Sequence, residues 1–262
     1  MNIVVLTNES DMARYFVNKL SFTVDIKNVY IEKKYNNFSK KQRVIKSIFG
    51  ERCLEVLIQL KKVLKEKKSK VLELDKKIEK EKLYQYFKDF NEIVAMNKFD
   101  FYNINLTSTR DINTLKSDNI DILILFGTSI IKENILSLPK IGTINFHSSI
   151  LPYYKGSRVE FWQLYYDDYD YCGSTVHYVD TSVDTGDIII QEKIEVDKKD
   201  IFWDLRYKNI IKGLELIPKA IELIQKNEPT KKQANIRQQV FKGSMITEDK
   251  IKELYVKKGF II

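Results

Sequence analysis

Hydrophobic residues along the chain fall into short runs, and these runs alternate with longer stretches of helical periodicity. The runs predict β-strands at positions 3–6, 24–31, 99–104, 122–126, 143–146 and 174–179, from position 188 onward, and at about 236–241. The run ILILF at 122–126 carries no charge, as expected for a strand that is buried on both faces of a sheet. Strands that alternate with helices indicate an α/β fold with a doubly wound, mostly parallel sheet.

Apolar residues at helical spacing predict the helices. They recur in this way at positions 41–66, 72–90 and 200–227. A last helix is predicted to begin after a Thr247 cap, with TEDK as its first turn. The stretch 40–92 is too long for a single crossover helix, so we interpret it as a helical insertion. We expect an α/β domain at 1–228 that contains this insertion, and a small C-terminal appendage at 229–262.

Nearly all of the net charge of +8 lies in the insertion. Residues 40–92 hold 16 Lys or Arg against 9 Asp or Glu. A basic excess can indicate a nucleic acid or an acidic membrane surface as partner. Here lysine is interleaved with glutamate and repeated aromatic residues for base stacking are lacking, so a solvated helical face is favoured. Apolar positions such as Leu57 and Ile58 need a partner surface, which we expect to be the sheet edge or the second subunit of a homodimer.

The sequence shows no feature of a membrane or secreted protein. No uninterrupted apolar run approaches the roughly 18 residues of a membrane span, and the first residues lack a signal peptide. The two cysteines, Cys53 and Cys172, provide neither a disulfide framework nor zinc-ligand spacing. We therefore expect a cytoplasmic protein without a metal.

Candidate chemistry lies within residues 127–186, which hold five of the nine glycines. In TINFHSSILPYYKG, a strand ends at about Phe146, and ligands bind beyond the carboxyl ends of strands in open parallel sheets. Asn145 and His147 are two positions apart, so an extended backbone places both on one face. An amide can donate to a developing oxyanion, and an imidazole can exchange a proton near neutral pH. Residue type alone leaves an ordinary structural histidine equally open.

Two further polar elements follow that strand. His177 lies in the alternating run STVHYV, and we interpret it as a strand histidine whose hydrogen bonds are satisfied by its neighbours. The loop VDTSVDTGDIII carries Asp180, Asp184 and Asp187, which are turn residues by default. One of these carboxylates, brought near an imidazole, would raise its basicity or relay protons through water.

The segment NFHSSILPYYKG, followed by GSTVHYVDTSVDTGDIIIQEKI, resembles the formyltransferase family that uses 10-formyltetrahydrofolate. The resemblance covers roughly residues 118–196 and places Asn145, His147 and Asp184 in register. It implies a formyltransferase-type, Rossmann-like fold and transfer of a formyl group to an amine. By this resemblance Asn145 and protonated His147 stabilise the oxyanion, and Asp184 holds or relays the proton lost by the amine. No metal or nucleotide cofactor is implied.

The resemblance also implies binding residues. Folate would lie against two loops, formed by Gly127, Thr128, Ser129 and Ile130 and by Thr181, Ser182, Val183 and Asp184. An ordinary turn with Ser129 as a helix N-cap is the structural alternative, and both can hold. The substrate would meet Lys155, Gly156 and Arg158. Arg158 can equally form a surface ion pair with Glu160.

Another expectation concerns the helix that follows this loop. We expect Phe161 and Trp162 to anchor it in the core, in preference to stacking on a base or a sugar. The two sequence departures from the family, Ser148 for proline and Ile150 for leucine, are not expected to touch the chemistry.

Three amine acceptors are known for this family. Glycinamide ribonucleotide enzymes carry a glycine-rich phosphate loop after the first strand, whereas here that loop, TNESDMA, has no glycine and two acids. Methionyl-tRNA enzymes add a large C-terminal domain, for which the roughly 35 residues after the long helix are too few. We therefore expect an amino-deoxysugar nucleotide. The other two acceptors, a hydrolase that releases formate, and a polyanion-binding module on the same fold are the alternatives.

Overall fold

The computed structural model describes residues 1–33, 47–48, 55–59, 69–234, 236 and 239–261. The chain divides into two compact units, which are Met1–Lys33 with Lys82–Met245 and Lys34–Glu81 with Ile246–Ile262. We describe each unit by itself. The domain boundary expected between residues 228 and 229 stays a prediction.

The described residues of the larger unit form one seven-stranded sheet in the order β3-β2-β1-β4-β5-β6-β7. Its strands are β1 (Ile3–Thr7), β2 (Ile26–Glu32), β3 (Phe101–Ile104), β4 (Ile122–Phe126), β5 (Gly142–His147), β6 (Gly173–Tyr178) and β7 (Ile188–Lys193). Neighbours from β3 to β5 run parallel, whereas β6 and β7 are antiparallel to their neighbours. The predicted mostly parallel, doubly wound sheet is therefore confirmed.

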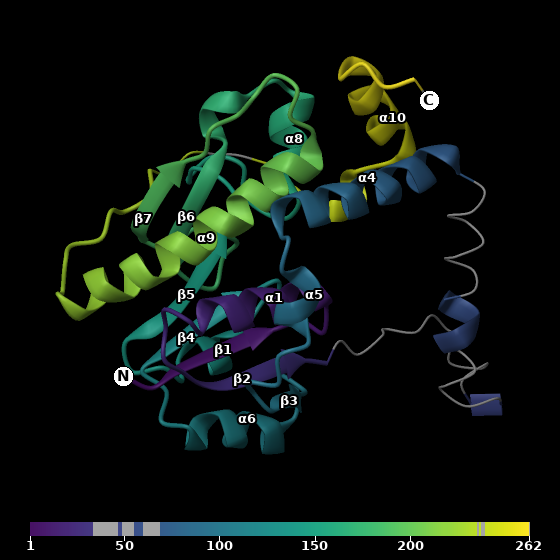
Figure 1. Cartoon of the computed structure of the whole chain (residues 1–262). Coiled ribbons are helices and arrows are strands. Elements are labelled where there is room, and N and C mark those ends of the chain that lie inside the picture. Colours follow the sequence, from purple (N-terminus) through teal and green to yellow (C-terminus); the bar gives the residue numbers. More distant parts are fainter. Residues whose placement is uncertain (34–46, 49–54, 60–68, 235, 237–238, 262) are drawn as a thin grey trace. The chain divides into compact units, whose positions relative to one another are not determined.

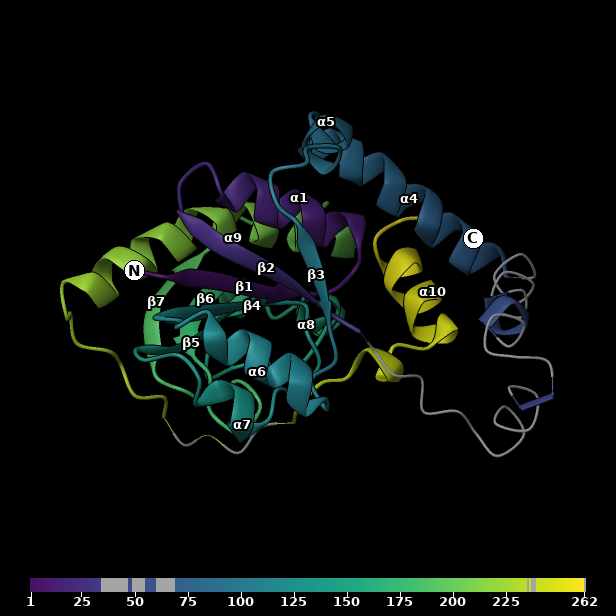
Figure 2. The ribbon, with the colours of Figure 1, turned by 90° about the horizontal axis from the view of Figure 1, so that it is seen from below.

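Helices cover both faces of this sheet (Figures 1 and 2). They are α1 (Asp11–Leu20), α5 (Phe90–Val94), α6 (Thr109–Ser117), α7 (Glu133–Leu136), α8 (Val159–Tyr165) and α9 (Phe202–Gln225), with short 3-10 turns η1 (Tyr169–Tyr171) and η2 (Gly243–Met245). On one face the Phe16 ring of α1 stacks on Phe126 at 3.9 Å, and Gly213 of α9 lies against Phe146. On the other face Leu115 of α6 and Ile135 of α7 belong to one buried cluster with strand residues. The β4 run ILILF is accordingly buried from both sides, as predicted.

The helix α4 (Lys70–Tyr86) belongs to both units, and its last turn is tied to the start of α9. The buried Asp204 carboxylate accepts hydrogen bonds from Lys82 Nζ at 2.7 Å and from the Tyr86 hydroxyl at 3.0 Å. It also accepts from the Ile201 N–H at 3.0 Å, which is one of the donors that a helix start leaves unpaired. A buried carboxylate is costly without such partners, so these contacts hold the last turn of α4 at the start of α9 within the larger unit.

In the smaller unit, the first part of α4 meets the C-terminal helix α10 (Glu248–Lys257). The predicted Thr247 cap is confirmed, since the Thr247 hydroxyl accepts from the Lys250 N–H. Ser69 Oγ donates to Glu248 Oε1, and the Tyr255 hydroxyl donates to Asp75. The predicted helix at 41–66 lies outside the described residues except for 47–48 and 55–59, which are helical.

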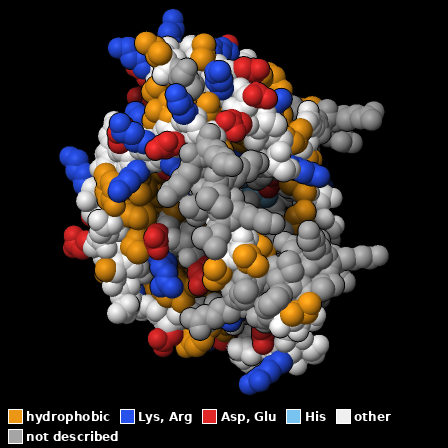
Figure 3. All heavy atoms as spheres, turned by 90° about the vertical axis from the view of Figure 1, so that its right-hand side faces the viewer, with side chains coloured by type: hydrophobic (Ala, Val, Ile, Leu, Met, Phe, Trp, Pro, Cys, Tyr) orange, Lys and Arg blue, Asp and Glu red, His pale blue; other side chains and the backbone are white. Residues whose placement is uncertain are grey.

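Charged side chains of both signs are interspersed among the described residues on the face drawn in Figure 3. Among the described residues, no helix is long and apolar enough to cross a membrane. The same part of the chain contains no cluster of three or more His, Cys, Asp or Glu side chains suited to a metal ion. The location of the protein in the cell stays a prediction.

Candidate active site

Asn145 and His147 are the third-last and last residues of β5, so the predicted strand-end position is confirmed. The antiparallel β6 places His177 directly opposite Asn145. Because residues alternate between faces along a strand, all three side chains project from the same face of the sheet. That face is opposite to the one on which Phe146 packs against α1 and α9.

Asp184 lies in the loop between β6 and β7, and its carboxylate faces both imidazole rings. Its Oδ2 is 3.5 Å from His147 Nδ1, and its Oδ1 is 3.6 Å from His177 Nε2. The Gly156 N–H donates to the same Oδ2 at 2.8 Å. Asn145 Nδ2 is 3.4 Å from His177 Nε2. The structure thus brings together Asn145, His147 and Asp184, the three residues named from the sequence, and adds His177.

Backbone carbonyls fix the orientation of both rings. His147 Nε2 lies 2.9 Å from the Tyr154 carbonyl oxygen, and His177 Nδ1 lies 2.7 Å from the Tyr178 carbonyl oxygen. A carbonyl oxygen only accepts, so these two ring nitrogens carry the hydrogens. The remaining nitrogens, His147 Nδ1 and His177 Nε2, therefore face Asp184. A proton added at either one would give an imidazolium next to a carboxylate.

Asp184 is an ionised partner for these rings. Burial alone raises the pKa of its carboxyl group, but the His147 and His177 imidazoles and the Gly156 N–H outweigh burial and hold the pKa well below 3.8, its ordinary value. Asp184 therefore stays a carboxylate at neutral pH, and its negative charge stabilises positive charge that develops on the rings facing it.

His177 was predicted from the sequence to be a strand histidine whose hydrogen bonds are satisfied by its neighbours, and it was not named as a site residue. Its side chain is buried and its Nδ1 bonds the Tyr178 carbonyl, as that prediction requires, but its Nε2 also faces Asp184 and Asn145. The signal lay in the pairing of two strands: only the register that sets His177 opposite Asn145 shows that both point into one site.

The loop assigned to folate begins at Gly127, immediately after β4. Gly127 has φ +67°, and a Cβ there would lie 2.4 Å from Asn8 Nδ2, which donates to the Gly127 carbonyl at 3.0 Å. Ser129 donates its N–H to Glu32 Oε2 at 2.7 Å, and its hydroxyl donates to the same carboxylate. The alternative of Ser129 as a helix N-cap is wrong, because α7 begins only after Lys132 and the Ser129 groups are held by β2 instead.

The remaining residues assigned to folate lie at the surface of their loops. Thr128 is half-buried, and Ile130 is exposed over 75 % of its area. In the second loop, Thr181 and Ser182 are exposed and Val183 is half-buried. Asp180 shapes this loop, since its Oδ1 accepts from the Ser182 N–H at 2.9 Å and from the Thr185 hydroxyl at 2.6 Å. Contact with folate stays a prediction for all of these residues.

The three residues assigned to the substrate lie between β5 and α8. Lys155 is largely buried, Gly156 binds Asp184 through its N–H, and Arg158 is exposed at the start of α8 with φ +55°. The alternative surface pair of Arg158 with Glu160 is wrong. Glu160 is 1 % exposed and lies 3.7 Å from Arg206 of α9, because the first turn of α8 directs it inward.

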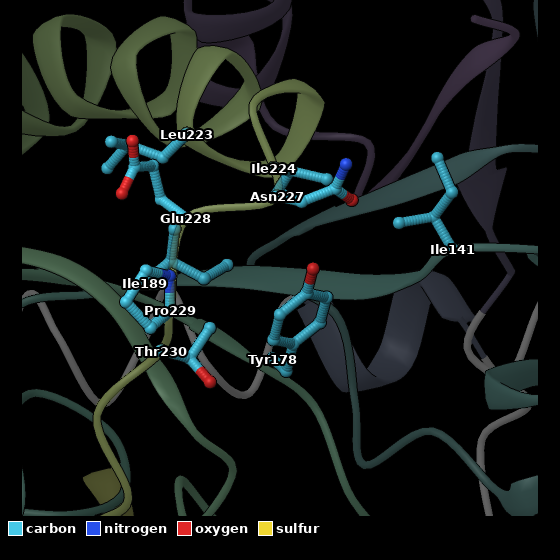
Figure 4. Close-up of a pocket in the computed structure, with 9 residues that line it drawn as sticks. All are labelled: Ile141, Tyr178, Ile189, Leu223, Ile224, Asn227, Glu228, Pro229 and Thr230. Atoms are coloured by element: carbon cyan, nitrogen blue, oxygen red, sulfur yellow. The ribbon is translucent and has the colours of Figure 1, made fainter.

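Two other features lie away from this cluster. Phe161 and Trp162 are each 2 % exposed, which confirms that they anchor α8 in the core. A cavity of about 240 Å³ lies beside the C-terminal end of α9, and the Tyr178 ring extends into it toward Ile224 and Asn227 (Figure 4). Tyr178 follows His177 in β6, so the cavity lies on the face opposite to Asp184 and is not the predicted site.

This chain is similar in sequence and in fold to known formyltransferases. The chain is 34 % identical over 137 residues to the methionyl-tRNA formyltransferase of Prochlorococcus marinus (strain MIT 9215), which covers 52 % of this chain but only 42 % of that protein. The chain thus spans about two fifths of the length of this curated relative. Its fold is similar to that of a sugar N-formyltransferase from Shewanella sp FDAARGOS_354, with a TM-score of 0.58, 12 % identity, and coverage of 94 % of this chain and 78 % of that one.

A second similar structure is the formyltransferase PseJ from Anoxybacillus kamchatkensis, solved in complex with UDP-4,6-dideoxy-4-formamido-L-AltNAc and tetrahydrofolate. It has a TM-score of 0.51, 20 % identity, and coverage of 97 % of this chain and 90 % of that one. At these identities the two structures establish the fold alone. The sequence model of the family described as "Formyl transferase" matches residues 61–221, more than half of the chain, and includes every residue of the polar cluster. The chain therefore belongs to the formyl transferase family.

Proposed function

We propose that this protein transfers the formyl group of 10-formyltetrahydrofolate to a substrate amine. The observation that carries the proposal is the position of Asp184, whose carboxylate oxygens lie 3.5 Å from His147 Nδ1 and 3.6 Å from His177 Nε2 beside the Asn145 amide. Acyl transfer needs a donor for the oxyanion and a group that handles the proton of the attacking amine. This cluster provides both at a strand end, where open α/β sheets bind ligands.

In the proposed reaction the neutral amine attacks the formyl carbon, and a nitrogen–carbon bond forms. Asn145 Nδ2 and the Nδ1–H of protonated His147 stabilise the oxyanion that develops on the formyl oxygen. The Asp184 carboxylate lies beside His147 Nδ1 and offsets the positive charge of the protonated ring. In the proposed reaction it also holds the water that carries the proton away from the amine. The bond between the formyl carbon and N10 then breaks, and the proton ends on N10 of tetrahydrofolate. Folate would lie against the loop at Gly127–Ile130, where the exposed Ile130 suits a flat, partly apolar ring.

For the acceptor we propose an amino-deoxysugar nucleotide. The loop after β1 supports this choice over glycinamide ribonucleotide, because the start of α1 is already occupied by protein groups. The Ser10 hydroxyl accepts from the Ala13 N–H, and the Asn8 amide binds the Gly127 carbonyl. Glu9 and Asp11 add negative charge where a phosphate would have to sit. Methionyl-tRNA is the second candidate, favoured by the sequence relative from Prochlorococcus marinus.

A screen of amines with 10-formyltetrahydrofolate tests the proposal. Release of tetrahydrofolate is followed with a UDP- or dTDP-linked amino-deoxysugar, glycinamide ribonucleotide and methionyl-tRNA, and without amine. Release that depends on the sugar nucleotide is the expected result. Release without amine would show a hydrolase, and release with another amine would replace the acceptor. No release in any arm, with folate binding absent, would reject the proposed activity and favour a binding module.

A further inference from the structure

Described residues that follow α9 contact both loops that carry the candidate site. The contacts are made by Thr230–Gln233, which we call the first arm, and by Phe241–Gly243, which we call the second arm. Both arms belong to the larger unit. Both arms lie in the stretch 229–262, which was predicted from the sequence to be an appendage of unknown role. Their contacts connect that stretch to the candidate site.

The first arm holds the loop that carries Asp184. Lys231 and Ile188 exchange two backbone hydrogen bonds of 2.8 and 2.9 Å, which fixes the arm at the start of β7. Gln233 Nε2 then donates to the Asp184 carbonyl at 3.1 Å and to the Gly186 carbonyl at 2.7 Å. Asp184 has φ +51°, a conformation that costs energy for a residue with a side chain and persists only where the surroundings impose it. Gln233 provides part of that support.

The second arm holds the loop that carries Gly156. The Phe241 N–H donates to the Lys155 carbonyl at 2.8 Å, and the Ser157 N–H donates to the Phe241 carbonyl at 2.9 Å. Gly156 lies between these two bonds, so its own N–H is left for Asp184. The Phe241 ring stacks on Tyr154 with centroids 5.4 Å apart. The Tyr154 carbonyl is in turn the acceptor for His147 Nε2.

We propose that Gln233 and Phe241 are positioning residues of the candidate active site. Gln233 sets the backbone from which the Asp184 side chain projects. Phe241 sets the Gly156 N–H and the Tyr154 carbonyl, which hold Asp184 and His147 respectively. Neither side chain contacts the substrate in the proposed reaction, so each residue acts through the residues that it holds. A misplacement of about 1 Å at a reacting group can lower a rate about 100-fold.

The substitution Gln233→Met tests the first arm, because methionine keeps the length of the side chain and removes its donors. Gln239→Met is the matched control, since Gln239 is exposed and, among the described residues, its amide has one hydrogen bond, to the Met245 sulfur at 3.9 Å. The kinetic measurement with these two variants rests on the proposed function. We expect Gln233→Met to lower kcat by about 10- to 100-fold with the KM for the folate donor changed less than about twofold. Equal kcat values for the two variants would overturn the proposal.

A second measurement does not depend on activity. The chain contains only two histidines, and both lie in the site, so nitrogen NMR of histidine-labelled protein reports on His147 and His177 alone. We expect Gln233→Met to shift the imidazole signals, and Gln239→Met to leave them at the positions of the parent. Unchanged signals in folded Gln233→Met protein would overturn the proposal even if the parent proves to have no transferase activity.

A variant of the second arm covers the case in which Gln233→Met does not fold. Phe241→Leu removes the stacking on Tyr154 and keeps the backbone bonds, and Val240→Ala, at an exposed neighbour, is its control. We expect Phe241→Leu to shift the NMR signal of His147 and to lower kcat. We expect Val240→Ala to keep the thermal midpoint and the NMR spectrum of the parent. A Phe241→Leu spectrum identical to that of the parent would overturn the role of the second arm.

Discussion

Gly156 and Asp184 lie 28 residues apart in the chain and meet through a hydrogen bond of 2.8 Å from the Gly156 N–H to Asp184 Oδ2. The contact depends on glycine for two reasons. Gly156 has φ +106°, and a Cβ at this position would lie 2.0 Å from the Phe241 carbonyl oxygen. A residue without a side chain therefore fixes the carboxylate of the candidate site.

Gly156→Ala should both destabilise the protein and lower turnover. The added methyl group has to displace Phe241, so we expect a loss of more than about 1 kcal/mol in the free energy of unfolding. Gly243→Ala is the matched control, because the nearest side-chain atom to a Cβ there is 3.7 Å away. Urea unfolding measures both variants. Equal stability of Gly156→Ala and Gly243→Ala would contradict the steric argument.

His147→Ala and Asp184→Ala should each abolish most of the turnover while the protein stays folded. Loss of one oxyanion donor or of one acid/base group costs about 100-fold or more in kcat. Tetrahydrofolate release measures the turnover, and circular dichroism measures the fold. A His147→Ala protein that turns over at nearly the parental rate would refute the assigned mechanism.

Asp184 should also make stability depend on pH. Burial raises the pKa of its carboxyl group, but the two imidazoles and the Gly156 N–H lower it by more than burial raises it. The pKa in the folded protein therefore lies below the unfolded value of 3.8. The unfolded chain then binds more protons in acid, and the stabilisation is fully present above about pH 5 and is lost as the pH falls toward the folded pKa. We expect the unfolding free energy of the parent to fall more steeply from pH 5 to pH 2 than that of Asp184→Asn. Parallel curves from urea titrations would count against this.

His177→Ala should lower kcat by about tenfold or more, because it removes the ring that lies between the Asn145 amide and Asp184. Tyr178→Phe is a suitable control, since that side chain enters the cavity on the opposite face and the backbone is unchanged. Steady-state assays of tetrahydrofolate release measure kcat for both variants. If His177→Ala kept the turnover of Tyr178→Phe, the first interpretation of His177 as a purely structural residue would be restored.

The lysine-rich stretch at 40–92 is expected not to be a nucleic-acid surface. A gel-shift titration with tRNA at low and moderate salt measures the log–log slope, which reflects the number of phosphates neutralised. We expect weak binding. The expectation fails if binding is tight, has a slope of several units, and is lost when Lys61, Lys62, Lys65, Lys67 and Lys68 become Gln. That result would also favour methionyl-tRNA over a sugar nucleotide as the acceptor.

The fold could be predicted wherever local pattern and final environment coincide. The uncharged ILILF run predicts a strand buried on both faces, and β4 has that environment; most apolar positions of α9 are likewise buried along its length. Asn145 and His147 could be placed together because two residues of one strand share a face without any knowledge of tertiary structure.

The sequence interpretation failed where a residue's partner is distant in the chain. Ser129 resembled an N-cap, but its partner is Glu32 of another strand. Glu160 resembled a surface partner of Arg158, but the turn of α8 directs it toward Arg206. The roles of Gln233 and Phe241 depend on a polar segment that returns to loops formed far earlier, and no local periodicity marks such a return.

The two arms have a practical consequence for the smallest fragment that can be expected to work. A protein ended after α9 would retain all seven strands of the sheet, both histidines and Asp184. It would lose the Gln233 amide that donates to the Asp184 carbonyl and the Phe241 backbone that bonds the residues on either side of Gly156. Any fragment, fusion or split version should therefore keep the chain through Met245, although the polar cluster itself is complete at Asp184, 61 residues earlier.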